Sequence, residues 1–165
     1  MSVELPKHWR WRDGSEPREG AAVVFDMDGV ISNASGRQHF LDGPGKKDWN
    51  GFFDACGEDT VIPEVARLIE LLDPGVVVVM LTGRPVRVRR LTVPWLERNG
   101  VRWDLLVMRP MGSYAASLEF KRKTIAELRG VGLDPQLAFE DDRRNADMFT
   151  EEGVPCIYID SGYYA

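Results

Sequence analysis

Cysteine is scarce in this chain. Cys56 and Cys156 are the only two among 165 residues, and no C-x-x-C pair occurs. This pattern disfavours a disulfide framework and a zinc ribbon, which both need grouped cysteines. With 44% hydrophobic residues the chain can bury one sizeable core but hardly two, so we expect a single domain.

Long apolar runs and an excess of positive charge are lacking as well. No run approaches the ~20 apolar residues that a membrane span needs, and residues 1–20 contain no apolar signal segment. We therefore expect a soluble, cytoplasmic protein without membrane contact, with an N-terminal tail over 1–20 and a domain over 21–165. The net charge of -5 gives no overall attraction to polyanions, so nucleic-acid binding would need a local basic patch.

What the chain does contain is a regular alternation of short apolar runs and helical patterns, which is typical of βαβ units around a parallel sheet. The first predicted helix has its N-cap at Asp59 or Thr60, and the second predicted helix bends or breaks near Pro94. The predicted fold class is a single Rossmann-like α/β domain with a mainly parallel central sheet. The predicted strands cover 22–25, 76–81, 105–108, 137–139 and 154–159, and the helices 60–72, 85–99, 119–128 and 144–149.

Polar clusters follow three of these strands. Asp26-Met-Asp-Gly leaves the first, Thr82-Gly-Arg the second and Glu140-Asp-Asp a later one. Ligands of open α/β sheets bind beyond the carboxyl ends of the strands, so we expect these clusters to converge. Two acids spaced i, i+2 at such an edge can supply a nucleophile and an acid/base group.

Taken in order, these residues resemble the motifs of the haloacid dehalogenase superfamily. Asp26-Met-Asp-Gly-Val-Ile31 is similar to motif I, Leu81-Thr-Gly-Arg84 to motif II, Lys121 to motif III and Asp141-Asp142 to motif IV. The chain departs from the pattern at Ser117, where the family carries an acid four residues before its lysine, and Lys123 is an alternative to Lys121.

Within this superfamily, further details resemble the phosphatase domain of polynucleotide kinase-phosphatases. They are Gly36-Arg37 after motif I, the arginine of Thr-Gly-Arg, the Asp-Asp-Arg at motif IV and the closing Asp160-Ser-Gly-Tyr-Tyr164. The resemblance implies a Mg²⁺-dependent phosphatase that forms an aspartyl-phosphate.

The resemblance also implies a role for each matching residue. Asp26 would be the nucleophile and Asp28 the acid/base group. Asp142 would ligate Mg²⁺ directly and Asp141 through water, although the two could be exchanged. The implied substrate-binding residues are Thr82, Gly83, Arg84, Lys121 and Arg37, and the implied metal site comprises Asp26, the main-chain carbonyl of Asp28, Asp142 and Asp141.

The short stretch of sequence between motifs I and II favours a bulky substrate. Only a short irregular segment, about 32–58, separates motif I from the next helix, so that any cap is minimal and the mouth of the site open. A phosphorylated DNA or RNA end, with its phosphate on the 3'-oxygen, would fit. Cations and aromatics interleave at Lys7, Trp9, Arg10, Trp11 and Arg12, and arginines gather at 84, 87, 89 and 90, which predicts a strand-binding rim.

Three alternatives stay open on the sequence. A phosphatase of free nucleotides or other small phosphate esters would use the same motifs. A receiver domain that accepts phosphate on aspartate and a catalytically idle binding module are the non-enzymatic alternatives. No G-x-x-x-x-G-K-[ST] loop is present, so we expect any kinase, or a ligase partner, to be a separate polypeptide.

Overall fold

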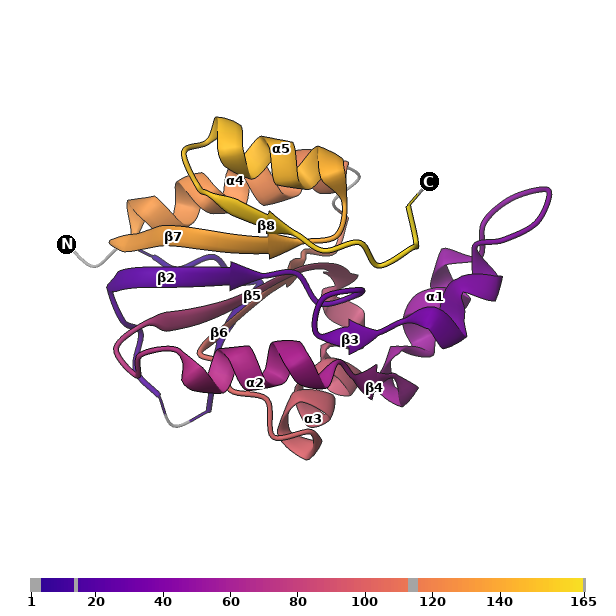
Figure 1. Ribbon diagram of the computed structural model, residues 1–165, viewed down its shortest axis with the longest axis horizontal. Helices are drawn as coiled ribbons and strands as arrows, with labels where there is room; N and C mark the ends of the chain where they lie inside the picture. The colour runs from indigo at the N-terminus through magenta and orange to yellow at the C-terminus, as the bar shows by residue number, and fades with distance from the viewer. Residues whose placement is uncertain (1–3, 14, 113–115, 165) are drawn as a thin grey trace.

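A six-stranded sheet forms the centre of the protein in the computed structural model, which describes residues 4–13, 15–112 and 116–164 (Figure 1). The strand order is β1-β6-β5-β2-β7-β8. Only β1 runs antiparallel to its neighbour, so the predicted single α/β domain with a mainly parallel sheet is confirmed. The strands are β1 Trp9–Trp11, β2 Gly20–Phe25, β5 Val77–Pro85, β6 Leu105–Arg109, β7 Leu133–Glu140 and β8 Cys156–Tyr158.

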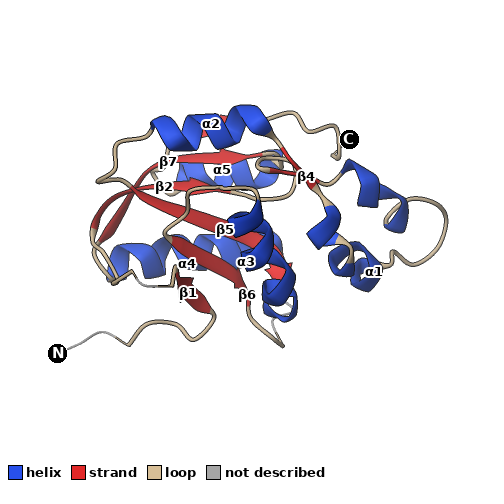
Figure 2. Ribbon diagram, turned by 90° about the horizontal axis from the view of Figure 1, so that it is seen from below, coloured by secondary structure: helices blue, strands red, loops and turns tan. Residues whose placement is uncertain are grey.

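Helices cover both faces of this sheet (Figures 1 and 2). Alternate residues of β2 point to opposite faces, as in any strand. Val23 and Phe25 pack on the side of α2 and α3, and Ala22 and Val24 pack on the side of α4 and α5. Both faces of β2 are therefore buried, which explains its uninterrupted apolar run. The helices are α2 Pro63–Leu71, α3 Arg89–Arg98, α4 Ser117–Gly130 and α5 Arg143–Glu151.

Two helix predictions need correction. The first helix, α2, has its N-cap at Ile62 rather than at Asp59 or Thr60. Thr60–Val61 stays extended because it pairs as β4 with β3, Ser32–Asn33. The second, α3, continues through Pro94, and the burial of Trp95 directly after the proline anchors that part of the helix in the core.

The segment predicted as an N-terminal tail contributes an edge strand. Within the predicted range, residues 1–3 and 14 lie outside the described part of the chain, while β1 pairs with β6. Trp9 is only 7% exposed and Trp11 packs against the same apolar cluster. These two tryptophans are therefore not presented to a nucleic acid, and that part of the predicted rim is wrong. The division of the chain at residue 20 stays a prediction.

A small insert projects from the edge of the sheet where β2 and β5 end (Figure 1). The hairpin of β3 and β4 forms its base. The segment predicted to be irregular contains the short helix α1, Trp49–Asp54, and two 3-10 helices, η1 Ser35–Phe40 and η2 Cys56–Glu58. The minimal cap is thus a compact insert beside the carboxyl ends of the strands. In the described part of the chain, none of the helices has the length and apolar character that crossing a bilayer requires.

Candidate active site

The loop after β2 brings the first pair of acids to the sheet edge. The backbone turns sharply here, because the N–H groups of Val30, Ile31 and Ser32 all donate to the carbonyl oxygen of Met27. Gly29 has a φ of +83°, and a Cβ at this position would lie 2.2 Å from Asp141 Oδ2. Only glycine fits both the conformation and the close approach. The contact also brings motif I directly against motif IV.

Lys121 lies between two carboxylates. Its Nζ is 3.1 Å from Asp26 Oδ1 and 2.8 Å from Glu140 Oε2, and all three side chains are buried. Burial alone would lower the pKa of Lys121, but the charges of Asp26 and Glu140 outweigh it and raise that pKa. The lysine is therefore a fixed positive charge beside Asp26. Lys123, the alternative considered from the sequence, is exposed on the same helix.

Asp26, Glu140 and Asp141 form a cluster of three carboxylates, and the single positive charge of Lys121 does not neutralise all of them. One carboxylate oxygen from each lies within 4.8 Å of the others. Burial and the charge of Asp26 raise the pKa of Glu140 to about 7 and that of Asp141 to about 9. Asp141 Oδ2 accepts a hydrogen bond from Ser161 Oγ at 2.7 Å, while its Oδ1 is buried without a partner. These carboxylate oxygens fit a hard divalent cation such as Mg²⁺.

The adjacent acid, Asp142, has a different position. Its Oδ1 accepts a hydrogen bond from the backbone N–H of Arg144 at 3.0 Å and caps the N-terminus of α5. Its Oδ2 is paired with the Arg144 guanidinium at 3.0 Å. Asp142 was predicted as the direct metal ligand, with an exchange for Asp141 left open; of the two, Asp141 belongs to the carboxylate cluster with Asp26 and Glu140.

Asp28 is held by two buried arginines rather than by solvent. Arg37 Nη2 lies 2.8 Å and Arg84 Nη2 2.6 Å from Asp28 Oδ1. Arg37 also binds Asp59 through Nε and Nη2, at 2.8 and 2.6 Å, and Asp59 accepts a further hydrogen bond from Ser32 Oγ. Arg37 and Arg84 were predicted to bind phosphate, but in the structure their guanidinium groups are engaged with these aspartates.

The arginines determine the charge state of Asp28. Burial acts to raise the pKa of Asp28, but the charges and hydrogen bonds of Arg84 and Arg37 outweigh it, so its pKa is lowered. The pKa of Arg84 is raised in turn, mainly by Asp28, against the effect of its burial. Asp28 is therefore an oriented carboxylate in this state of the site.

A cavity of about 660 Å³ opens beside these groups, within the size range of ligand sites. Thr82 and Gly83, at the end of β5, line it as predicted, together with Asp26, Asp28 and Lys121. Residues of the insert line another part of its wall: Gln38, Leu41, Asp42, Lys47, Trp49, Phe52 and Phe53.

The predicted arginine rim is not a continuous basic surface. Arg84 is fully buried, and Arg87 pairs with Asp54. Arg89 donates to the carbonyl oxygen of His8 at 3.0 Å. Arg90 is exposed on α3. The clustering of these arginines in sequence therefore does not place them on one binding face.

The structure brings two residues into the site that were not predicted there, Asp59 and Arg109, and it gives Glu140, expected only as part of a converging cluster, a direct contact with Lys121. Arg109, at the end of β6, lines the cavity, and its Nε is buried without a hydrogen-bond partner. Burial lowers the pKa of Arg109, and no carboxylate of the described residues pairs with it within 4 Å. Its position at the carboxyl end of a strand is the one sequence signal that could have identified it.

Comparison with known proteins identifies a family and several solved structures that this chain resembles. The family model described as the polynucleotide kinase PNKP phosphatase domain matches residues 20–164. A chain from the structure of the Pnkp1/Rnl/Hen1 RNA repair complex is 21% identical, with a TM-score of 0.69, over 96% of this chain and 47% of that chain. A second Pnkp1/Rnl/Hen1 structure is 22% identical, with a TM-score of 0.71, over 96% and 50%. This chain thus spans about half the length of both.

Another similar structure aligns over the same share of its own chain as of this one. The haloacid dehalogenase-like hydrolase SP0104 from Streptococcus pneumoniae is 12% identical, with a TM-score of 0.58, over 83% of each chain. At such identities, likeness to these solved structures shows the fold.

Proposed function

This chain belongs to the family of polynucleotide kinase PNKP phosphatase domains and is a phosphatase of the haloacid dehalogenase type, and from this premise we propose that it removes 3'-phosphates from nucleic-acid ends. The observation that carries the proposed chemistry is the buried contact of Asp26 with Lys121 and the acids at the end of β7, beside a cavity. The receiver and idle-module alternatives do not agree with this family.

Asp26 is the proposed nucleophile. One of its carboxylate oxygens attacks phosphorus, the bond from phosphorus to the 3'-oxygen breaks, and an aspartyl-phosphate forms. Lys121, 3.1 Å from Asp26, offsets the repulsion between that carboxylate and the incoming phosphate. Water then hydrolyses the acyl phosphate and regenerates Asp26. Because phosphoryl transfer depends mainly on positioning and charge stabilisation, the buried lysine supports this assignment.

Asp28 is the proposed acid/base group. In the first step it gives a proton to the leaving 3'-oxygen, and in the second it takes one from the attacking water. The contacts of Arg37 and Arg84 orient the carboxylate at the cavity wall and favour its ionised form. That form is the one needed to accept the proton from water.

Mg²⁺ is the proposed cofactor, held by Asp26, Asp141 and the main-chain carbonyl of Asp28. When bound, it would supply charge neutralisation for the phosphate and the surrounding carboxylates. Glu140 keeps Lys121 in place and accepts hydrogen bonds from the backbone N–H groups of Asp141 and Asp142, which holds the β7 end in position. Asp142 supports the site as the cap of α5.

Substrate phosphate would lie between Thr82, Gly83 and Lys121. Arg109 is a further proposed contact, because a half-buried guanidinium without a carboxylate partner suits an anion. The small insert leaves room for a polymer, and the likeness to the Pnkp1 chain of an RNA repair complex makes RNA ends a candidate alongside DNA ends. By the same likeness we propose assembly with other repair proteins, such as a separate kinase or ligase.

The test is phosphate release from matched substrates with Mg²⁺. A 3'-phosphorylated oligonucleotide, as DNA and as RNA, is compared with a 5'-phosphorylated one, a 3'-mononucleotide and an aryl phosphate. We expect a strong preference for the 3'-phosphorylated oligonucleotide. Equal or better turnover of mononucleotides would move the function to free nucleotides and contradict the proposal.

Rapid quenching with ³²P-labelled substrate tests the intermediate. Asp26→Asn should abolish both turnover and covalent labelling, whereas Asp28→Asn should slow both half-reactions and still become labelled. Asp13→Asn, which changes an exposed acid paired with Arg10 beside β1, serves as the matched control. Full activity of Asp26→Asn would overturn the mechanism.

A further inference from the structure

Helix α1 of the insert carries an aromatic cluster, here called the Trp49 shelf, in which the buried Phe52 and the half-buried Phe53 pack against the exposed Trp49. The Trp49 ring stacks on Phe53 with 5.9 Å between ring centroids and an angle of 24°. It meets Phe52 edge-on at 5.8 Å. Although these contacts hold the ring in place, 48% of Trp49 is exposed. The indole is therefore held in a fixed position with about half of its surface open to a ligand.

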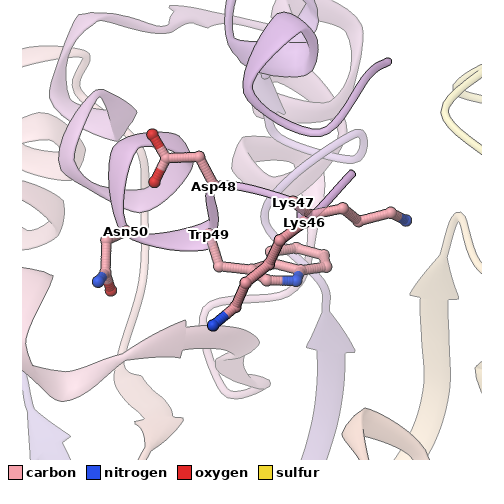
Figure 3. A pocket seen from close by; sticks show the side chains of 5 residues that line it. All are labelled: Lys46, Lys47, Asp48, Trp49 and Asn50. Carbon is pink, nitrogen blue, oxygen red and sulfur yellow. The ribbon is translucent and has the colours of Figure 1, made fainter. Parts of the chain in front are cut away.

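Positive charge flanks the shelf. Lys47 Nζ lies 5.7 Å from the centroid of the Trp49 ring, and the Lys46 side chain, which extends in a different direction, lines a recess together with Trp49 (Figure 3). Asp48 points away from the indole, and its Oδ1 caps α1 by accepting from the N–H of Gly51 at 2.9 Å. In the parts of the chain that the structure covers, neither lysine pairs with a carboxylate within 4 Å.

The shelf is continuous with the catalytic cavity. Trp49 and Lys47 line the cavity that also contains Asp26 and Thr82. The same two residues line an adjoining recess of about 390 Å³ between Lys46 and Asn50. A polymer whose terminal phosphate reaches Asp26 therefore has a path across the indole.

We infer that the Trp49 shelf binds a nucleobase next to the 3'-phosphorylated end of a single strand, with Lys46 and Lys47 contacting its backbone phosphates. This inference rests on the proposed function. A planar aromatic ring with cations at its edge fits a stacked base joined to anionic phosphates, and stacking on aromatic side chains tolerates any base. The shelf would thus distinguish a polynucleotide end from a small phosphate ester without reading its sequence.

The test compares ratios of kcat/KM rather than single rates. The ratio of kcat/KM for a 3'-phosphorylated tetranucleotide to that for an aryl phosphate is measured in the wild type and in Trp49→Ala. We expect the ratio to fall about 5- to 150-fold in Trp49→Ala, the range that the loss of one stacked base gives, and to recover largely in Trp49→Phe. Leu71→Ala, which removes an exposed apolar side chain on α2, should keep the wild-type ratio.

Substrates with one abasic position give an independent readout. In the wild type, one abasic position should lower kcat/KM as much as Trp49→Ala does, and it should have no further effect in Trp49→Ala. Lys47→Ala should reduce the dependence of log(kcat/KM) on log salt concentration by about 0.7, the slope expected for one phosphate contact of a single strand.

The outcomes separate this inference from the proposed function. If the wild type prefers the oligonucleotide and Trp49→Ala keeps that preference, the shelf assignment is wrong and the proposed function stands. A wild type without any preference for oligonucleotides would contradict the proposed function itself. If Trp49→Ala leaves the ratio unchanged but abolishes self-association in sedimentation, the shelf contacts a second copy of the chain, and the inference fails.

Discussion

Replacing Asp59 by alanine is expected to lower the free energy of unfolding by about 3 kcal/mol, because removal of one partner from a buried ion pair leaves an uncompensated charge. The Asp59 side chain is 3% exposed and binds Arg37 at 2.6 and 2.8 Å. Arg37 would keep its hydrogen bonds to Asp28 and to the carbonyl oxygen of Phe52, at 2.8 and 3.0 Å, and its position over the Phe52 ring, 4.3 Å from the ring centroid. These remaining contacts place the expected loss at the lower end of the range for such pairs.

Urea unfolding followed by far-ultraviolet circular dichroism measures this loss, which corresponds to a fall in Tm of about 6–12 °C for a chain of this size. Asp54→Ala is the matched control, since Asp54 lies in the same insert as Asp59 and also pairs with an arginine, Arg87, but is 54% exposed. It should cost less than about 1 kcal/mol. If Asp59→Ala costs no more than this control, the network contributes little to stability and the reasoning is refuted.

A double replacement separates stability from activity. Arg37→Met combined with Asp59→Leu exchanges the buried ion pair for apolar groups and should recover most of the lost stability. It should not recover activity, because Asp28 would then retain Arg84 alone as its orienting partner. Recovery of both quantities would show that Arg37 has no positioning role.

Four further predictions concern other parts of the molecule. Gly29→Ala should weaken Mg²⁺ binding about 10- to 100-fold in a titration of Tm, because a Cβ 2.2 Å from Asp141 Oδ2 displaces that carboxylate. Mg²⁺ at a hundred times its Kd should stabilise the wild type by about 2.7 kcal/mol, and Asp141→Asn should lose most of this gain. Arg109→Met should raise KM for a 3'-phosphorylated oligonucleotide about tenfold or more without lowering stability in urea, since a charge-assisted hydrogen bond contributes roughly 1.5–3 kcal/mol. Burial lowers the pKa of His8 below 6.5, so protonation of His8 favours the unfolded chain; as pH drops from 7 to 5, the wild type should lose stability relative to His8→Gln.

The sequence predicted the parallel sheet well because its strands are buried on both faces. Val77 to Leu81 and Ala22 to Phe25 are uninterrupted apolar runs, and such runs are characteristic of strands covered on both sides. The edge strand β1 was missed because it is only three residues long and lies among charged and turn-forming residues. The Trp-Arg-Trp alternation was nevertheless a strand signal, since it places both indoles on the same face.

The site was predictable where a residue is tied to a strand end and not where tertiary contacts decide its role. Asp26, Asp28 and Thr82 follow buried strands, so their convergence follows from the topology. Asp141 and Asp142 are adjacent, and which one faces Asp26 depends on where α5 begins. Asp59 precedes a helix and has the local pattern of an N-cap, and nothing in its neighbours in sequence shows that it binds Arg37.

The arginine network also bears on how one carboxylate can act first as an acid and then as a base. With both arginines in contact, the pKa of Asp28 is lowered, which suits the step that takes a proton from water. In the proposed mechanism, a phosphate dianion in the cavity that Arg84 lines would compete with Asp28 for the same guanidinium. Such sharing would weaken the contact of Arg84 with Asp28 and would raise the proton affinity of that carboxylate while the ester is bound. Asp59 keeps Arg37 fixed during this exchange. On this proposal, the buried pair of Arg37 and Asp59 would contribute to catalysis as well as to stability.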